Sequence, residues 1–165
     1  MSFLAPWFEG RLEVGGIPDD FMKRLEERVR NGLFIPGSRL RANYRVEHAS
    51  RDAVKFAAED SWTAINIGLN EVTVRRSARA ELSYDVRFWR WTGYCVVLSA
   101  VVATGIALIW PFIGHEIEAW PPGRFLFWGN VVFWGIAWPW VLTALHKKPA
   151  ARCLERILLE ELREP

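Results

Sequence analysis

The sequence contains little cysteine and none of the short motifs that mark the common enzyme classes. Its two cysteines are Cys95, inside a long apolar run, and Cys153, outside it, so we expect neither a disulfide between them nor a zinc site. No GxGxxG, Walker-type, HExxH or GxSxG motif occurs. The sequence therefore favours a non-enzymatic protein and predicts no cofactor.

The sequence also lacks a strong excess of one charge. The formal net charge of the 165 residues is +2, and residues 1–90 contain fifteen basic and thirteen acidic side chains. This balance argues against a nucleic-acid partner, because binding to phosphates needs an excess of basic side chains. Arg39, Arg41 and Arg45 would form a stripe on one sheet face, and an anionic lipid headgroup is the simpler partner for it.

Two long stretches, residues 91–113 and 125–145, contain no charged residue at all. As helices with a rise of about 1.5 Å per residue they would measure roughly 32–35 Å, enough to cross a hydrocarbon core of about 30 Å. The alternative, a buried helix pair in a soluble protein, would need more surrounding mass than this chain has. We therefore expect a transmembrane hairpin over residues 91–146, with an outer loop at 114–124.

Basic residues flank the expected hairpin on one side. Five arginines lie between residues 75 and 90, and a second basic cluster follows Leu145, whereas the loop offers only Arg124 against Glu116 and Glu118. By the positive-inside rule, both termini then face the cytoplasm. In a bacterium the membrane would be the inner one.

Residues 1–90 predict a cytoplasmic α+β domain, with one helix on an antiparallel sheet of four or five strands. Apolar residues recur every four positions at Phe21, Leu25 and Val29, which indicates a helix over about 18–31. Alternation of apolar and polar residues predicts strands around residues 40–46, 54–58, 65–69, 72–74 and 80–88.

The two ends of the chain leave alternatives open. The aromatic segment 2–17 either packs onto the domain, which we favour, or lies on the membrane surface. Residues 147–165 predict a short amphipathic helix that begins near Pro149. This tail helix could dock onto the domain, lie at the membrane interface or pair with a partner. Within the second span, Pro139 predicts a bend.

Tyr44, Phe56, Trp62 and Asn66 are candidate ligand-binding residues. They combine large aromatic rings with a side-chain amide around the predicted sheet, and such a combination could line a pocket for a lipid or a small apolar molecule. The simpler interpretation of the Asn residues is that they satisfy the backbone of a turn.

A second candidate set lies in or beside the spans. Arg87 and Arg90 end the last strand with no Gly or Pro before the first span, so we expect them near lipid headgroups. Asn130 is a polar amide in lipid that needs a partner, and Trp134 lies near mid-span, where an interfacial anchor is not expected. These residues predict contact with membrane lipid and with other membrane subunits or a second copy of the chain.

Two polar clusters carry weaker signals. His115 has Glu116 and Glu118 beside it but no second histidine, so an ordinary loop is the better interpretation and we predict no metal site. His48 and Asp52 would serve an enzyme whose site lies at the cytoplasmic interface. The leading hypothesis is nevertheless a non-enzymatic accessory or scaffolding subunit of a larger membrane assembly, with a lipid-binding or ligand-binding module as the alternative.

Overall fold

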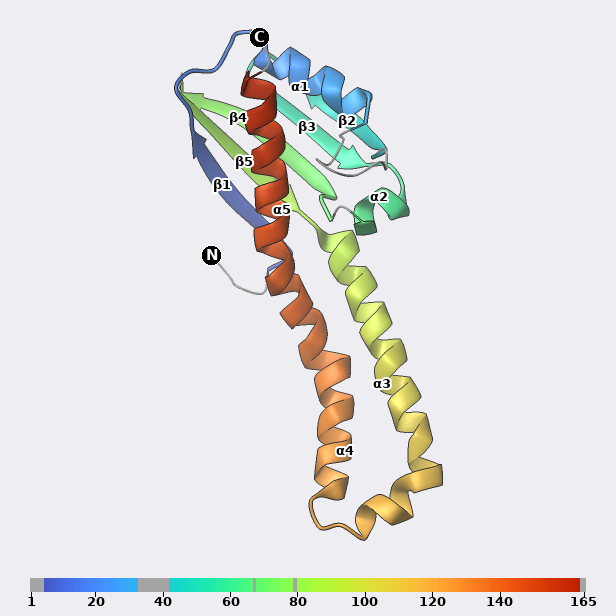
Figure 1. Cartoon of the computed structure of the whole chain (residues 1–165). Coiled ribbons are helices and arrows are strands. Elements are labelled where there is room, and N and C mark those ends of the chain that lie inside the picture. The colour runs from blue at the N-terminus through green and yellow to red at the C-terminus, as the bar shows by residue number, and fades with distance from the viewer. Residues whose placement is uncertain (1–4, 33–41, 67, 79, 164–165) are drawn as a thin grey trace.

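The computed structural model describes residues 5–32, 42–66, 68–78 and 80–163. These residues form an antiparallel sheet with the strand order β1-β5-β4-β3-β2, followed by a long helical hairpin (Figure 1). The expected α+β domain followed by a hairpin is confirmed. The strands are β1 (Trp7–Glu13), β2 (Tyr44–Ala49), β3 (Ala53–Ala58), β4 (Glu71–Ala78) and β5 (Glu81–Arg87), and the helices are α1 (Phe21–Arg30), α2 (Ser61–Asn66), α3 (Trp89–Glu118), α4 (Gly123–Val132), the π-helix η1 (Phe133–Ala137) and α5 (Trp138–Arg163).

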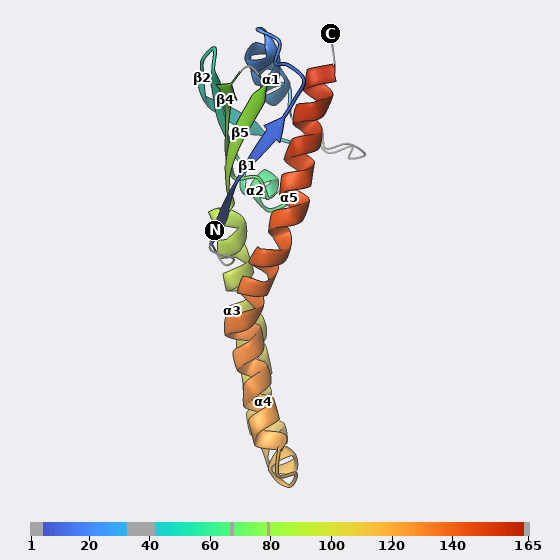
Figure 2. The same cartoon turned by 90° about the vertical axis from the view of Figure 1, so that its left-hand side faces the viewer.

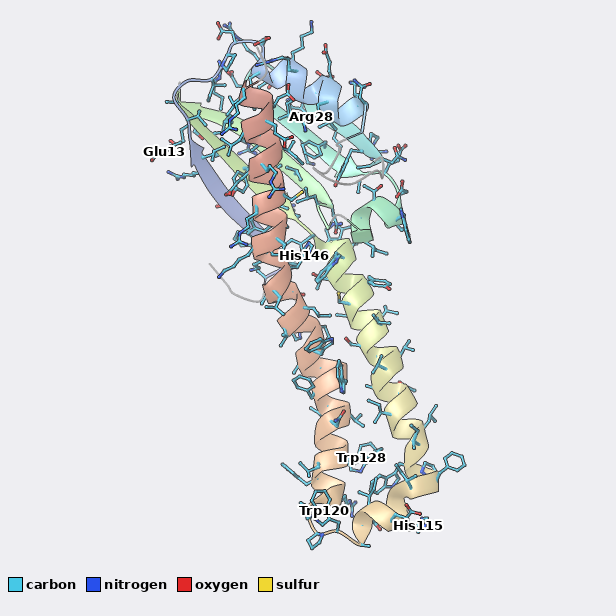
Figure 3. All side chains as sticks on the ribbon, in the orientation of Figure 1. Glu13, Arg28, His115, Trp120, Trp128 and His146 are labelled. Carbon is cyan, nitrogen blue, oxygen red and sulfur yellow. The ribbon has the colours of Figure 1, made fainter. Side chains whose placement is uncertain are left out.

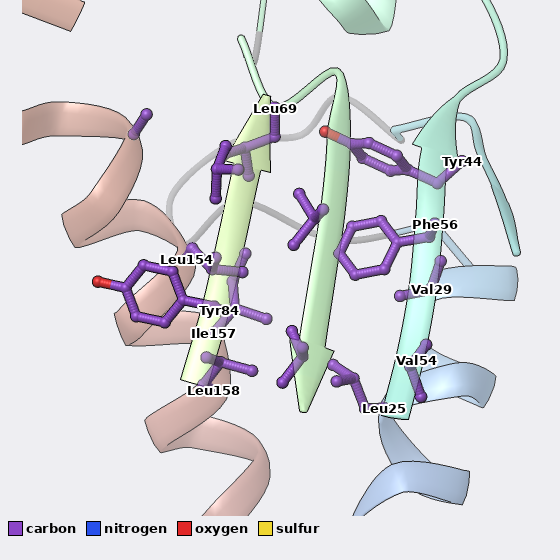
Figure 4. Close-up of a cluster of buried hydrophobic side chains, with 14 of the residues drawn as sticks. Leu25, Val29, Tyr44, Val54, Phe56, Leu69, Tyr84, Leu154, Ile157 and Leu158 are labelled. Carbon is purple, nitrogen blue, oxygen red and sulfur yellow. The ribbon is translucent and has the colours of Figure 1, made fainter. Parts of the chain in front are cut away.

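Helix α1 covers one face of the sheet through the apolar stripe that its sequence predicts. Phe21, Leu25 and Val29 are fully buried. The helix ends at Arg30 with Asn31 as its C-cap, and Gly32 follows with a φ of +86°, a conformation that a residue with a Cβ adopts only with strain. The core lies between this face and the helices, where Phe56 and Val54 of β3 contact the inner side of α1 (Figure 4).

Two short segments differ from the sequence prediction. The strand expected around residues 65–69 is wrong, because residues Ser61–Asn66 form α2. The Asp60 carboxylate accepts the backbone N–H of Thr63 at 2.6 Å and starts this helix. The aromatic segment does pack onto the domain, but it does so as strand β1, paired along its whole length with β5. Gly10 conceals the alternation of this strand, because a Cβ at Gly10 would collide with the ring of Tyr84.

The tail docks onto the sheet, but it is not a separate helix. Helix α5 begins at Trp138 and continues through Pro149 to Arg163, so the second span and the tail are one element (Figures 1 and 2). Pro149 removes one backbone hydrogen bond. Burial of Leu154, Ile157 and Leu158 against the sheet offsets that loss, at about 1.5–3 kcal/mol for each fully buried side chain.

The hairpin buries small and polar side chains and exposes large apolar ones. Helix α3 buries Cys95, Ser99 and Ala103 against the second helix, and a Cβ added to Gly135 would lie 3.0 Å from the Ala103 Cβ. The π-helix η1 ends at Ala137, two residues before Pro139, and includes the turn in which a regular helix would clash with the proline ring. Gly93 and Gly105, two other small residues of α3, have open space around them and do not take part in this contact.

Helices α3 and α4–α5 are both long and apolar enough to cross a membrane. In their most apolar stretches only 11% and 6% of the residues are buried, whereas the core helix of a soluble protein would be mostly buried. This exposure supports assignment as a membrane protein with two candidate spans.

Candidate functional site

The face of the sheet opposite α1 and α5 carries a groove of about 860 Å³. No helix of the described chain covers this face, as the side view shows (Figure 2). The strand alternation that points apolar residues toward α5 points charged and polar residues toward the groove. Its lining includes Glu9 and Arg11 of β1, Asp85 and Arg87 of β5, Glu71, Thr73 and Arg75 of β4, Lys55 of β3 and His48 of β2. We call this surface the open face.

The open face mixes charges of both signs. Glu9 pairs with Asp85 across β1 and β5, so two carboxylates lie side by side. Arg87 approaches Asp85 at 3.5 Å. Lys55 lies 2.7 Å from Glu47 and, by its hydrogen bond, holds the pKa of that carboxyl below its usual range. Such a mosaic suits another protein surface better than a polyanion, which would be repelled by the carboxylates.

The opposite face is closed by polar contacts as well as by the core. Arg28 of α1 donates to Glu160 at 2.8 Å and to the buried Glu161 at 3.3 Å, both on α5 (Figure 3). Tyr84 of β5 donates its hydroxyl hydrogen to Glu155 at 2.5 Å, and burial together with this hydrogen bond raises the pKa of Tyr84. Helix α5 is therefore held at a fixed place on the sheet.

A buried amide, Asn70, caps α3 at the joint between the domain and the hairpin. Asn70 lies 1% exposed, just before β4. Its side-chain oxygen accepts the backbone N–H groups of Arg90 at 2.7 Å and Trp91 at 3.1 Å, in the first turn of α3, and its side-chain nitrogen donates to Ala64. Phe88, at the N-cap of α3, has no side chain that could cap the helix, so Asn70 supplies the cap from another segment.

Helix α5, the second helix that links the domain to the hairpin, packs at the same joint. The ring of His146 stacks on Trp91 with the ring centroids 4.1 Å apart, and its Nε2 lies 3.4 Å from the carbonyl oxygen of Gly68. Gly68 has a φ of +72°, and a Cβ there would collide with His146. The domain is thus clamped onto both helices of the hairpin, with no flexible linker in either connection (Figure 3).

The structure separates Trp62 from two of the other predicted ligand-binding residues, Tyr44 and Phe56. Tyr44 and Phe56 are buried in the core and contact each other edge to face at 5.4 Å (Figure 4). Trp62 is 68% exposed on α2. Asn66 belongs to α2, but its side chain lies outside the described part of the chain. Trp62 and the core pair therefore do not line one cavity.

The second predicted set lies in two places. Arg87 and Arg90 lie at the joint, where Arg90 donates to the carbonyl of Ala58 at 2.9 Å and its guanidinium sits 5.4 Å from the Trp89 ring centre. Asn130 is exposed on α4, and Trp134 packs against Trp138 at 4.9 Å, one turn along the same helix. The predicted stripe is described only at Arg45, because residues 33–41, which include Arg39 and Arg41, lie outside the described part of the chain.

The structure also gives the positions of the two weaker polar clusters. His115 and Glu116 are exposed and 3.9 Å apart near the far end of α3. Asp52 lies in the β2–β3 turn, at the end of the sheet away from the hairpin, which is not the interface position expected for an enzyme site. No group of three or more His, Cys, Asp or Glu side chains among the described residues is arranged to hold a metal ion.

No protein-family model, curated protein sequence or solved structure matches this chain significantly. The functional argument therefore depends on the geometry alone.

Two elements of the joint were not predicted from the sequence, the Asn70 cap and the His146–Trp91 stack. A signal for the first was present: α3 begins after the aromatic Phe88, so its first N–H groups need a partner from elsewhere.

Proposed function

We propose that this protein is a non-enzymatic integral membrane protein that serves as a scaffolding subunit of a larger assembly. In this proposal the hairpin spans the bacterial inner membrane, both termini are cytoplasmic, and the open face receives a protein partner. The arginine-rich flanks support this orientation. The outer loop is short and carries few basic residues, as a translocated loop should.

The observation that carries the proposal is the clamped joint beneath an uncovered, charged sheet face. The Asn70 cap and the His146–Trp91 stack fix the domain to both helices, so the height and direction of the open face above the bilayer are fixed too. A domain on a flexible linker would sample many orientations. A fixed orientation lowers the entropy lost when a membrane partner docks, which is what a scaffold requires.

A pair of matched charge reversals tests the partner surface. The test variant is R11E/R75E on the open face, and the control is K23E/R30E on the exposed side of α1. The full chain is purified from its native host in mild detergent, and the proteins that accompany it are identified by mass spectrometry. We expect a protein that accompanies both the wild type and the control to be lost from the open-face variant.

Two results would contradict the scaffolding proposal. One is recovery of this chain with no other protein, and the other is a partner that both variants retain equally. The orientation has its own test, because a cysteine at Trp120 should react with an impermeant thiol reagent from outside the cell and a cysteine at Ser83 should not. Reversed labelling would invert the proposed topology.

A further inference from the structure

Asn130 is the only side-chain amide in residues 91–113 and 125–145, and it faces away from the hairpin. The second helix turns Gly135, Pro139 and Thr143 toward α3. Asn130 lies on the other side, on a face whose large side chains, such as Leu126 and Phe133, are exposed as well. No interaction of the Asn130 side chain with another described residue is found.

The depth of Asn130 makes this exposure costly. Along the helix axis it lies about 9 Å from Arg124 and about 25 Å from Lys147, at about 1.5 Å per residue. Those two charged residues enclose about 35 Å, so Asn130 falls inside a hydrocarbon core of about 30 Å. A side-chain amide there has no water to bond with, and its short side chain cannot reach the headgroups. Thr104, an exposed residue of the first span, can donate its hydroxyl hydrogen to a carbonyl of its own helix, whereas the amide has more hydrogen-bonding groups to satisfy.

We propose that Asn130 marks the interface at which two copies of this chain associate side by side in the membrane. An amide carries both donors and an acceptor, so two copies of the same amide satisfy each other. Copies inserted with the same topology can pair only about an axis along the membrane normal, which puts identical residues at identical depth. Asn130 therefore meets the partner's Asn130 at the depth where each lacks a hydrogen-bond partner.

The surroundings of Asn130 allow a close approach. Gly129 precedes it, and a Cβ added at Gly129 would find no atom within 4 Å. A groove of about 620 Å³ runs beside it along α4, lined by Pro121, Arg124, Phe125, Trp128, Gly129 and Val132. Ala137 adds a second small exposed residue on the face of Asn130, two turns further along. Small residues let two backbones approach in lipid, where packing rather than the hydrophobic effect drives association.

This interface rests on the proposed insertion of the hairpin in the membrane, but not on the scaffolding role of the open face. It lies on the hairpin, far from the open face, and it needs no other protein. In a pair formed this way both domains lie on the same side of the membrane, and neither open face is part of the interface between the copies. The two proposals can therefore fail separately.

Self-association is measured with the full chain in vesicles of neutral and anionic phospholipid. Donor-labelled and acceptor-labelled copies are mixed, and energy transfer is followed as lipid is added to dilute the protein. We expect N130L to raise the apparent dissociation constant of the pair about three- to tenfold, within the range of one interhelical hydrogen bond in lipid. N130Q, which keeps the amide, should recover part of the loss, and the matched control T104V should behave as the wild type.

Cross-linking through cysteines checks the geometry independently of any effect on stability. In a background with Cys95 and Cys153 replaced by alanine, a cysteine at Leu126 or Phe133 should form a disulfide with the same position of a second copy. A cysteine at Val97, exposed on α3, should not. A wild-type chain that stays monomeric on dilution, N130L pairing as strongly as the wild type, or cross-links at Val97 instead of Phe133 would each overturn the proposal. So would capture of a different membrane protein at Phe133 by a chain that does not pair with itself.

Discussion

The domain and the hairpin bury opposite kinds of side chain. The domain encloses Phe21, Leu25 and Phe56 and leaves its charges exposed. In the hairpin, the contact between the helices is made by Ser99, Ala103 and Gly135, whereas Leu108 is 67% exposed. The difference fits the proposal that the domain is built for water and the hairpin for lipid. Water drives large apolar groups inward, whereas lipid gives no free energy for burying them.

Helix α5 belongs to both regions, so the comparison can be tested along one element. Leu154→Ala, in the half of α5 under the sheet, should lower the free energy of unfolding of the domain by about 2–5 kcal/mol, because it removes a fully buried side chain and leaves a cavity. Urea unfolding in mild detergent measures this loss. The control Leu159→Ala, on the exposed side of the same helix, should change stability by no more than about 0.5 kcal/mol.

A third leucine extends this comparison into the hairpin. Leu108→Ala removes the same atoms as Leu154→Ala, but at a position that faces outward from α3. It should leave the unfolding of the domain unchanged. Equal destabilisation by all three substitutions would mean that the two regions do not differ in how they use apolar side chains.

The joint is the place where the two regions constrain each other. Asn70→Leu leaves the first N–H groups of α3 and the Ala64 carbonyl without their partner, at a cost of about 1–3 kcal/mol. Hydrogen exchange at Arg90 and Trp91 should become faster. Asn70→Asp keeps the accepting oxygen and should preserve most of the protection. Unchanged exchange in Asn70→Leu would show that the cap does not hold the joint.

The helix contact in the hairpin should be sensitive to volume rather than to apolar area. Gly135→Val places methyl groups against Ala103 and should destabilise the hairpin by about 1–3 kcal/mol, read as a lower midpoint of thermal unfolding in micelles. Gly105→Val introduces the same β-branched residue where there is open space. It should have a much smaller effect. Similar shifts for both would indicate a loss of helix propensity instead.

The smallest expected effect concerns pH and is confined to α2. The backbone N–H of Thr63 lowers the pKa of Asp60 below its usual value of about 3.9. The unfolded state therefore binds more protons in this range, so the stabilisation is complete above about pH 4 and is lost as the pH falls through the folded pKa. Hydrogen exchange of Thr63 should show this dependence in the wild type but not in Asp60→Asn. The same dependence in both would exclude Asp60 as its source.

Patterns with many repeats were predictable, and single contacts were not. The stripe Phe21, Leu25, Val29 and the alternation in β5 identified α1 and the last strand, because both repeat over several turns or residue pairs. In α2 the six residues are too few for a helical period to show, and Gly10 hides the alternation of β1. The first miss comes from a local side-chain cap, Asp60 on Thr63, and the second from a tertiary contact, the Tyr84 ring against Gly10.

The candidate site was predictable only in part, for a similar reason. The absence of Gly and Pro between β5 and α3 indicated a domain held close to the first span. It did not reveal that Asn70 and His146, distant in sequence, complete the joint. Pro149 predicts the start of a new helix, because a proline favours a first turn, but it lies within α5. Local preference was overridden there by packing on the sheet.

The unbroken course of α5 gives the molecule a mechanical property. Its 26 residues run from within the hairpin toward the end of the sheet that lies away from it, and Arg28 and Tyr84 hold the outer half on the domain. A bilayer that is thinner or thicker than the spans changes their tilt. Because α5 transmits that tilt as a lever, the sheet would lean with it, and the direction in which the domain points would report the thickness of the surrounding lipid.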